Sequence, residues 1–276
     1  MQNNQDTTVV IQYNMTNDYM FRYILQENEK VLRGLICALL SLKPEQIKSV
    51  EIKNPIDLSK NITGKDFIMD IRVLLNNDRL LNLEMQIKNE YNWPDRSLTY
   101  LCRAFDQLQS GQEYKDVLSV IHIGFTNFTL FPKEPEFYAT YRMLNVKKPT
   151  QVYSDKFTLS VVDLTQIDKA TSEDKASKID YWARLFKAKT WEELQMLAQN
   201  DEYLQEAARV IRIANEEDMI REHCRAREDA LQWERTLERD NKILKEKMAS
   251  LQDENTSLQD EIALLRKRIA ELETQD

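Results

Sequence analysis

Leucine recurs at every seventh position near the C-terminal end of the chain, in an unbroken series of six. No glycine follows Gly124 and no proline follows Pro149, so no strong helix breaker interrupts this region. A seven-residue apolar repeat forms one stripe along an α-helix, and such a stripe is buried against a second helix in a coiled coil. With the leucines at position d, the predicted core positions are Leu237, Asn241, Leu244, Met248, Leu251, Asn255, Leu258, Ile262, Leu265, Ile269 and Leu272.

The repeat also predicts the number and direction of the associated helices. Isoleucine at position a with leucine at d favours two strands, and Asn241 and Asn255 favour a parallel, in-register pair because each asparagine can bond with its copy. Upstream arginines alternate with acidic side chains, which argues against a basic-region zipper that enters a DNA groove. We therefore predict a homodimer joined by a parallel coiled coil over residues 231–276. Three interhelical charge pairs would be attractive and none repulsive: Asp240–Lys245, Glu261–Arg266 and Arg268–Glu273.

Residues 67–87 have the pattern of two strands joined by a tight turn. Phe67 to Leu75 and Leu80 to Ile87 are both rich in aliphatic side chains, and the intervening Asn76-Asn77-Asp78 tolerates turn geometry. If Asn77 is the midpoint of a three-residue loop, Leu75 pairs with Arg79 and the register of the whole hairpin is fixed.

In this register Asp70 lies directly opposite Glu84, and Ile68 lies opposite Gln86. Directly opposed residues share a face of the sheet, with Cβ atoms roughly 4.5–5.5 Å apart. Two carboxylates at that separation repel each other unless a hard divalent cation such as Mg²⁺ lies between them. A slip of one residue would move Glu84 to the other face, so the interpretation depends on the register.

Several blocks of the sequence resemble a known family. Asp70 followed by Glu84-Met85-Gln86 resembles the D…(D/E)xK signature of the PD-(D/E)XK nuclease superfamily. The glutamine form and the flanking text are most similar to the Rpn-type recombination-promoting nucleases, also described as PD-(D/E)XK family transposases. The similarity covers roughly residues 15 to 200 and includes Asn17-Asp18-Tyr19-Met20-Phe21-Arg22, Arg96-Ser97-Leu98-Thr99-Tyr100 and Gly111-Gln112-Glu113-Tyr114.

The resemblance implies a metal-dependent DNA endonuclease with a restriction-endonuclease-like fold. Asp70 and Glu84 would hold Mg²⁺, with Mn²⁺ as an alternative ion, and the backbone carbonyl of Met85 would complete the ligand set. Gln86 stands where the superfamily pattern has lysine, and it would orient a water or a phosphate oxygen without carrying charge.

Four other residues have two interpretations each. Asp18 resembles an acidic residue of the family's first helix that joins the metal shell, but it is also a helix cap candidate. Lys65 is either a phosphate or carboxylate partner or a solvated loop lysine. Arg96 and Tyr100 are one helical turn apart and would either contact a phosphate beside the metal or form an arginine–carboxylate pair and a tyrosine at the edge of the core.

The charge distribution weakens a simple DNA-binding reading. Residues 1–150 carry equal numbers of basic and acidic side chains, so the net charge of −8 belongs to the rest of the chain. Any contact with DNA must therefore come from local basic clusters. Two function classes remain open: the endonuclease, and a non-catalytic nuclease-fold binding module organised by the coiled coil. A transposase acting on defined DNA ends is a third possibility for which the sequence specifies no ends.

Composition indicates a reduced, aqueous environment. No apolar run is long enough for a transmembrane helix, and residues 1–12 lack the pattern of a signal peptide. Three widely spaced cysteines fit reduced thiols, and two histidines are too few for a zinc site. We expect a cytoplasmic protein without membrane contact.

The order of predicted elements favours an α/β fold in which helices flank a mixed central sheet. Helices are expected from about Tyr19, over Glu29 to Leu42 and over Arg96 to Gly111, with Asp95 as a cap, and the chain should be helical from Lys178 onward. We interpret His122 as a core histidine rather than a catalyst. The predicted domains are a flexible N-terminus (1–14), a nuclease-like core (15–170), a helical extension (171–230) and the coiled coil (231–276).

Overall fold

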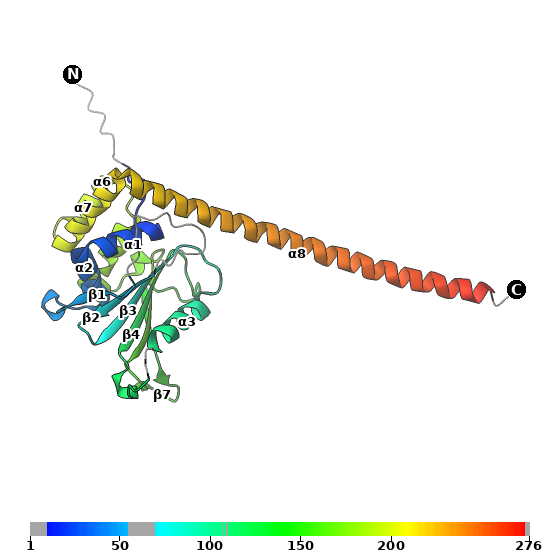
Figure 1. Ribbon diagram of the computed structural model, residues 1–276, viewed down its shortest axis with the longest axis horizontal. Coiled ribbons are helices and arrows are strands. Elements are labelled where there is room, and N and C mark those ends of the chain that lie inside the picture. Colours follow the sequence, from blue (N-terminus) through cyan, green and yellow to red (C-terminus); the bar gives the residue numbers. More distant parts are fainter. Residues whose placement is uncertain (1–9, 55–69, 107, 109, 274–276) are drawn as a thin grey trace, which may run out of the picture. The chain divides into compact units, whose positions relative to one another are not determined.

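A six-stranded mixed sheet forms the centre of the protein (Figure 1). The structure is a computed structural model, and it describes residues 10–54, 70–106, 108 and 110–273. The strand order is β1-β2-β3-β4-β8-β5, in which β3, β4 and β8 run parallel and the remaining neighbours are antiparallel. The predicted mixed α/β sheet is confirmed. Its strands are β1 (Val50–Ile52), β2 (Ile71–Leu75), β3 (Arg79–Gln86), β4 (Ser119–Thr126), β5 (Tyr138–Arg142) and β8 (Phe157–Asp163).

The β2–β3 hairpin has the predicted register. Leu75 pairs with Arg79, and the ladder continues to Ile71 opposite Leu83. Asn76 and Asn77 have φ angles of 52° and 59°, left-handed values that asparagine tolerates better than most residues. The predicted pairing of Ile68 with Gln86, and the first residues of the expected strand, lie outside the described residues.

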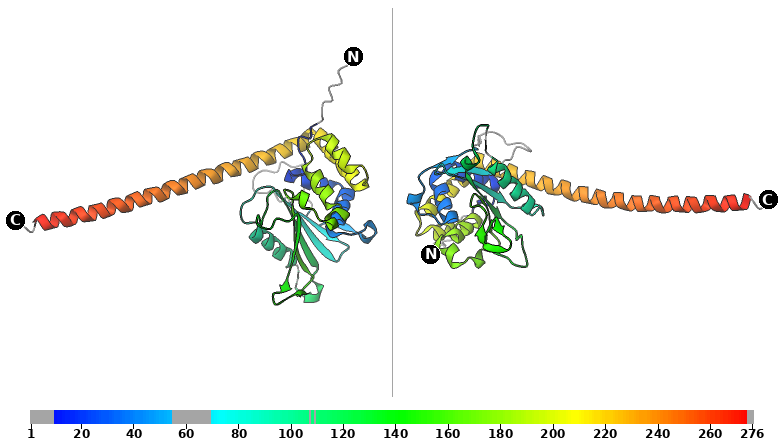
Figure 2. Two further views of the ribbon diagram at one scale, coloured as in Figure 1. Left: turned by 180° about the vertical axis from the view of Figure 1, so that it is seen from behind. Right: turned by 90° about the horizontal axis from the view of Figure 1, so that it is seen from below.

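One face of the sheet carries the main hydrophobic core. Leu81, Leu83 and Met85 of β3 alternate toward this face, where α1, α2 and α5 supply the facing side chains. Figure 2 shows the lime and yellow helices of the C-terminal part packed beside the blue α1 and α2, in agreement with contacts of α7 with both. These helices are α1 (Asp18–Glu27), α2 (Glu29–Leu40), α4 (Ser172–Ala176), α5 (Ile179–Lys187), α6 (Trp191–Ala198) and α7 (Glu202–Glu216).

On the other face of the sheet, α3 (Trp93–Phe105) is the one helix of the described residues that covers it, and it contacts β3, β4 and β8. A small second core lies beneath it and includes Leu80, Leu101 and Val120. Trp93 lies directly on Gly124, where a Cβ atom would stand only 2.0 Å from the Trp93 Cζ2 atom. The glycine in β4 therefore permits the tryptophan to lie close to the strand.

One cap assignment, in α1, and both ends of α3 differ from the sequence predictions, while α1 begins close to the predicted Tyr19. Asn17, not Asp18, caps α1, because its side chain accepts from the backbone N–H groups of Tyr19 and Met20. Helix α3 begins at Trp93 after Asn92, so Asp95 lies inside its first turn and is not the cap. The helix ends at Phe105, well before Gly111.

The region after Lys178 is helical, as predicted, but it is divided into four helices. The side chains of Thr190 and Asp201 accept hydrogen bonds from the first turns of α6 and α7, so these caps start new helices without glycine or proline. The last helix, α8 (Asp218–Glu273), is 56 residues long.

Residues up to Arg227 form one compact unit, and residues from Glu228 form a second. In the second unit the described apolar side chains at heptad positions a and d are 46–68% exposed in the single chain. The paired coiled coil and the predicted domain boundaries stay predictions. No helix in the described part of the chain is long and apolar enough to cross a membrane.

A short β-hairpin lies outside the main sheet and was not predicted. It consists of β6 (Leu144–Asn145) and β7 (Lys148–Val152), which pair only with each other. The three cysteines are free thiols, as the sequence predicts. Short 3-10 helices complete the fold: η1 (Pro44–Gln46), η3 (Tyr114–Asp116) and η4 (Ile167–Lys169).

Candidate metal and nucleic-acid site

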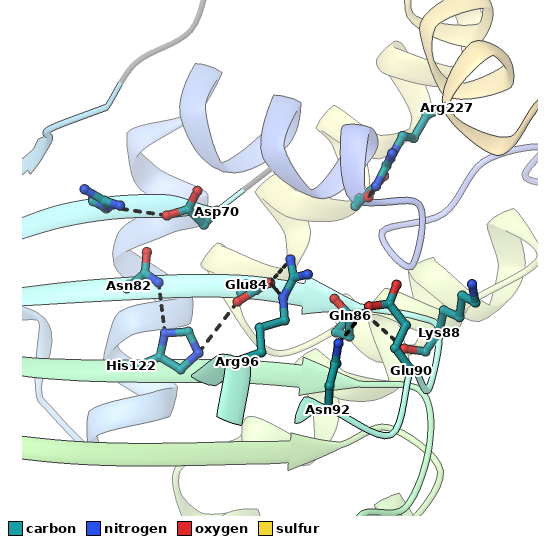
Figure 3. Close-up of polar contacts among 12 residues, drawn as sticks. Asp70, Asn82, Glu84, Gln86, Lys88, Glu90, Asn92, Arg96, His122 and Arg227 are labelled. Carbon is teal, nitrogen blue, oxygen red and sulfur yellow. Dashed lines mark hydrogen bonds and ion pairs between the residues drawn. The ribbon is translucent and has the colours of Figure 1, made fainter. Parts of the chain in front are cut away.

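Two buried carboxylates, one at the start of β2 and one on β3, lie on the α3 side of the sheet (Figure 3). Asp70 directly precedes β2, and continuing the observed ladder by one residue places it opposite Glu84. The two residues are only 7% and 4% exposed. The observed register is therefore the one from which the sequence predicts that Asp70 and Glu84 face each other, and the role of this pair as a metal site stays a prediction.

Arg96 provides the principal counter-charge of Glu84. Its Nε and Nη2 atoms lie 3.0 and 2.9 Å from the same carboxylate oxygen, Oε1. Burial raises the pKa of Glu84, Arg96 opposes this shift, and the carboxylate of Asp70 adds to it. The pair is the arginine–carboxylate contact that the sequence left as one of two interpretations for Arg96.

The two carboxylates keep one unsatisfied oxygen each. Asp70 Oδ2 and Glu84 Oε2 are fully buried and form no hydrogen bond with the described residues, although Arg72 Nε lies 3.4 Å from Asp70 Oδ2. Buried charged oxygens without partners are costly, and they suit a hard cation that takes carboxylate ligands. Among the residues that the structure describes, no three His, Cys, Asp or Glu side chains gather into a metal-binding group. These two residues therefore fit a divalent cation whose remaining ligands are backbone, substrate or water oxygens.

A buried pair of polar side chains lies directly beside Glu84. His122 is fully buried on β4, and its Nδ1 atom lies 2.9 Å from Nδ2 of Asn82 on β3. The amide donates to Nδ1, so the proton of the neutral ring is on Nε2, which points toward Glu84 Oε2 at 3.7 Å. Burial lowers the pKa of His122 to about 4, and Arg96 adds to the effect. The imidazole is therefore a neutral donor beside the carboxylate.

Aromatic rings from α3 cover this polar pair. Tyr100 stacks on His122 with ring centroids 6.2 Å apart, and the guanidinium of Arg96 lies 5.2 Å from the Tyr100 ring. Trp93 lies 5.9 Å from His122 on another side. The helix thus covers His122 while it holds Arg96 against the Glu84 carboxylate.

Helix α1 supports Asp70 from the opposite side. Arg22 is fully buried and donates to the backbone carbonyl oxygens of Asp70 and Asn54. The amide of Asn54 donates to the same Asp70 carbonyl at 3.0 Å and accepts from the Arg72 backbone at 2.7 Å. Burial lowers the pKa of Arg22 to about 10, and Asp70 opposes this shift. These contacts fix the backbone at the start of β2.

Gln86 and Met85 occupy opposite faces of β3. Gln86 lies two residues beyond Glu84 and is half-buried, and its amide donates to the carbonyl of Lys88 at 3.0 Å. The Met85 side chain enters the main core. Gln86 thus stands on the same face as Glu84 but is held by the following loop.

Asp18 takes part in a different contact. Its carboxylate accepts from Arg227 Nε at 2.8 and 2.9 Å and forms an ion pair with Nη2 at 2.6 Å. Figure 3 shows Arg227 well apart from Asp70 and Glu84. The proposed metal role of Asp18 stays a prediction, while Lys65 lies outside the described residues.

Sequence reasoning missed the residues that support the two carboxylates. Asn82 and Arg22 received no role, and His122 was interpreted only as a core histidine. The available signal was chemical: a polar or charged residue in an otherwise apolar strand or helix must find a buried partner. Which partner it finds depends on the pairing of β3 with β4 and on the packing of α1, neither of which is local.

Comparison with protein families gives one match. A family model described as PD-(D/E)XK nuclease family transposase matches residues 15–240. No match is found among curated proteins or among solved structures. The mixed sheet with flanking helices is consistent with the restriction-endonuclease-like fold that this superfamily implies. Because the match covers most of the chain and includes both carboxylates, this protein belongs to the PD-(D/E)XK nuclease family of transposases.

Proposed function

We propose that the protein is a divalent-metal-dependent DNA endonuclease that hydrolyses phosphodiester bonds. The observation that supports this proposal best is the pair of buried carboxylate oxygens, Asp70 Oδ2 and Glu84 Oε2, that form no hydrogen bond with the described residues. Membership of a nuclease family makes DNA the expected substrate.

Each residue of the site has a proposed role. Asp70 and Glu84 would hold Mg²⁺, or Mn²⁺ in its place, together with the backbone carbonyl of Met85. The bound cation would polarise the scissile phosphate and lower the pKa of an attacking water. Gln86 would orient that water or a phosphate oxygen. It has no charge to stabilise the transition state, so we expect modest activity.

Arg96 and Tyr100 would bind the substrate phosphate. A guanidinium with five donors suits phosphate oxygens, and Arg96 uses only two of its nitrogen atoms on Glu84. When a cation neutralises Glu84, the attraction that holds Arg96 to Oε1 weakens. The side chain could then donate to a phosphate at the same place.

Plasmid nicking in Mg²⁺ or Mn²⁺ tests the proposal. We expect cleavage by the wild type and its loss, by a factor of about 100 or more, in Asp70→Asn and Glu84→Gln, because a bound cation contributes several kcal/mol to the transition state and each 1.36 kcal/mol is about tenfold in rate. Asp78→Asn is the matched control, because Asp78 lies in the turn of the same hairpin and is exposed. Cleavage that persists in both site variants would refute this site.

A second candidate is a non-catalytic binding module with the same fold. It is favoured by the absence of the pattern lysine at Gln86 and by the ion pair that already neutralises Glu84. This module would bind DNA with equal affinity in the wild type and in Glu84→Gln, and neither protein would nick a plasmid at any metal concentration.

We also propose that the chain functions as a parallel homodimer joined through α8. The exposed a and d side chains of residues 237–269 would be buried in the pair. A dimer would bring two sites to one DNA duplex, one for each strand. This arrangement would suit double-strand cleavage in recombination or transposition.

A further inference from the structure

The β6–β7 hairpin is a protruding ribbon that combines basic and apolar side chains. Together with Arg142, the last residue of β5 that leads into it, the hairpin presents Lys147 and Lys148, and no acidic residue occurs between Glu136 and Asp155. Every side chain from 141 to 153 is exposed. The ribbon is therefore a local positive patch on a protein with a net charge of −8.

These three basic side chains are available for a partner. None of them forms an ion pair or a side-chain hydrogen bond with a residue of the described ranges. Basic side chains on helix α5, by contrast, have partners within the protein. The Arg184 guanidinium forms an ion pair with Asp168, and Lys187 donates to the carbonyl of Leu164. The positive charges of the ribbon are therefore not paired with acidic side chains of the described residues.

Apolar exposure on the ribbon also indicates an interaction surface. Val146 at its tip is 94% exposed and Tyr153 is 82% exposed, with Met143, Leu144 and Val152 partly so. Apolar side chains gathered on one protrusion are characteristic of binding surfaces. Their mixture with cations and without carboxylates fits a polyanion that also offers apolar groups, as duplex DNA does through the thymine methyl groups in its major groove.

The sheet register places the ribbon relative to the carboxylates. Arg142 is level with Thr158, Ile121 and Leu81 across the ladder, three residues from the level of Glu84. At about 3.3 Å for each residue, the ribbon starts roughly 10 Å from the Glu84 level and leads away from it. A duplex bound at both places would be contacted several base pairs from the scissile bond.

We propose that the ribbon formed by residues 142–153 is a DNA-binding element that holds the duplex through its phosphates, with the ribbon lying in or along the major groove. Such a groove is about 12 Å wide and admits a two-stranded β-ribbon. The inference rests on the proposed function for its choice of ligand. The ribbon would supply the local basic cluster that a core domain without net positive charge needs for binding DNA.

The test measures binding of a 30-base-pair duplex by fluorescence anisotropy over a series of salt concentrations, in EDTA so that cleavage plays no part. The test variant, R142A/K147A/K148A, removes the three positive charges. The first control, R142K/K147R/K148R, exchanges arginine and lysine and keeps the charge. A second control, K48A/K169A/K175A, removes the same charge from exposed positions elsewhere.

We expect the first variant to bind about tenfold or more weakly, and its slope of log affinity against log salt to fall by about 2–3, because each lost phosphate contact removes about 0.9. Both control variants should retain the wild-type slope. If the wild type binds and R142A/K147A/K148A has the same slope, the proposal that the ribbon binds DNA is overturned, and the proposed nuclease function is not affected. Absence of duplex binding by the wild type in EDTA would overturn the proposal about the ribbon, and the proposed nuclease function would be overturned only if plasmid nicking in Mg²⁺ or Mn²⁺ were absent as well.

Discussion

Substitution of Gly124 tests how the core of the protein positions the site. A Cβ at this residue would lie 2.0 Å from Trp93 Cζ2 and 2.6 Å from Cη2. Ordinary carbon contacts are about 3.5 Å, so in Gly124→Ala the indole would have to withdraw by roughly 1.5 Å. Trp93 is buried and begins α3, and therefore the start of the helix must move with it.

The displacement should separate Arg96 from Glu84. Their contacts of 2.9 and 3.0 Å would exceed hydrogen-bonding distance after a shift of that size, which would leave a buried carboxylate without its partner. Overpacking alone costs about 1–3 kcal/mol, and an unpaired buried charge adds to it. We expect a loss of about 3 kcal/mol, which lowers the urea midpoint by about 1–2 M.

A double-mutant cycle with Trp93→Leu isolates the clash. Removing the indole costs stability by itself but makes room for the methyl group, so the two substitutions together should cost about 1–3 kcal/mol less than their sum. Gly111→Ala is the control, because no atom lies within 4 Å of its Cβ position and only its φ of 92° opposes the change. If Gly124→Ala unfolds at the wild-type midpoint, or the cycle shows no coupling, the packing argument is refuted.

Three further predictions concern the coiled coil, the ion pair between Asp18 and Arg227, and the buried His122. Truncation after residue 230 should change the mass in light scattering from dimer to monomer, and a monomeric full-length chain would contradict the heptad argument. Arg227→Ala should lower the free energy of unfolding by about 3 kcal/mol, because Asp18 is left buried and unpaired; Asp18→Asn in the same background should recover part of that loss in urea titrations. The pKa of His122 falls from about 6.5 in the unfolded chain to about 4 in the fold, so below pH 6.5 the unfolded chain binds the proton more readily. The free energy of unfolding should therefore be unaffected by His122 above pH 6.5 and should decrease as the pH falls toward 4, by at most about 3 kcal/mol. His122→Gln should remove this difference in metal-free urea titrations, and parallel pH profiles of the two proteins would count against it.

Short-range patterns of residues specify the β2–β3 hairpin and the long helix α8. The hairpin register followed from its turn residues, since Asn76 and Asn77 accept left-handed backbone angles and the period of two then fixes every later pair. That was enough to bring Asp70 and Glu84 together. The absence of strong breakers also predicted the long helix α8, because helix propensity and periodicity are local properties.

Long-range packing of strands and helices sets the surroundings of the two carboxylates. The pairing of Asn82 with His122 requires β3 and β4 to run parallel in one register, although about 40 residues separate them in the chain. Arg22 reaches the Asp70 backbone only because α1 packs on the sheet, and Gly124 has its role only because Trp93 lies on it. Such contacts join segments distant in sequence, and their energies depend on burial. The chain therefore specifies its acidic pair locally, while the buried donors and the aromatic cover around that pair follow from the assembled fold.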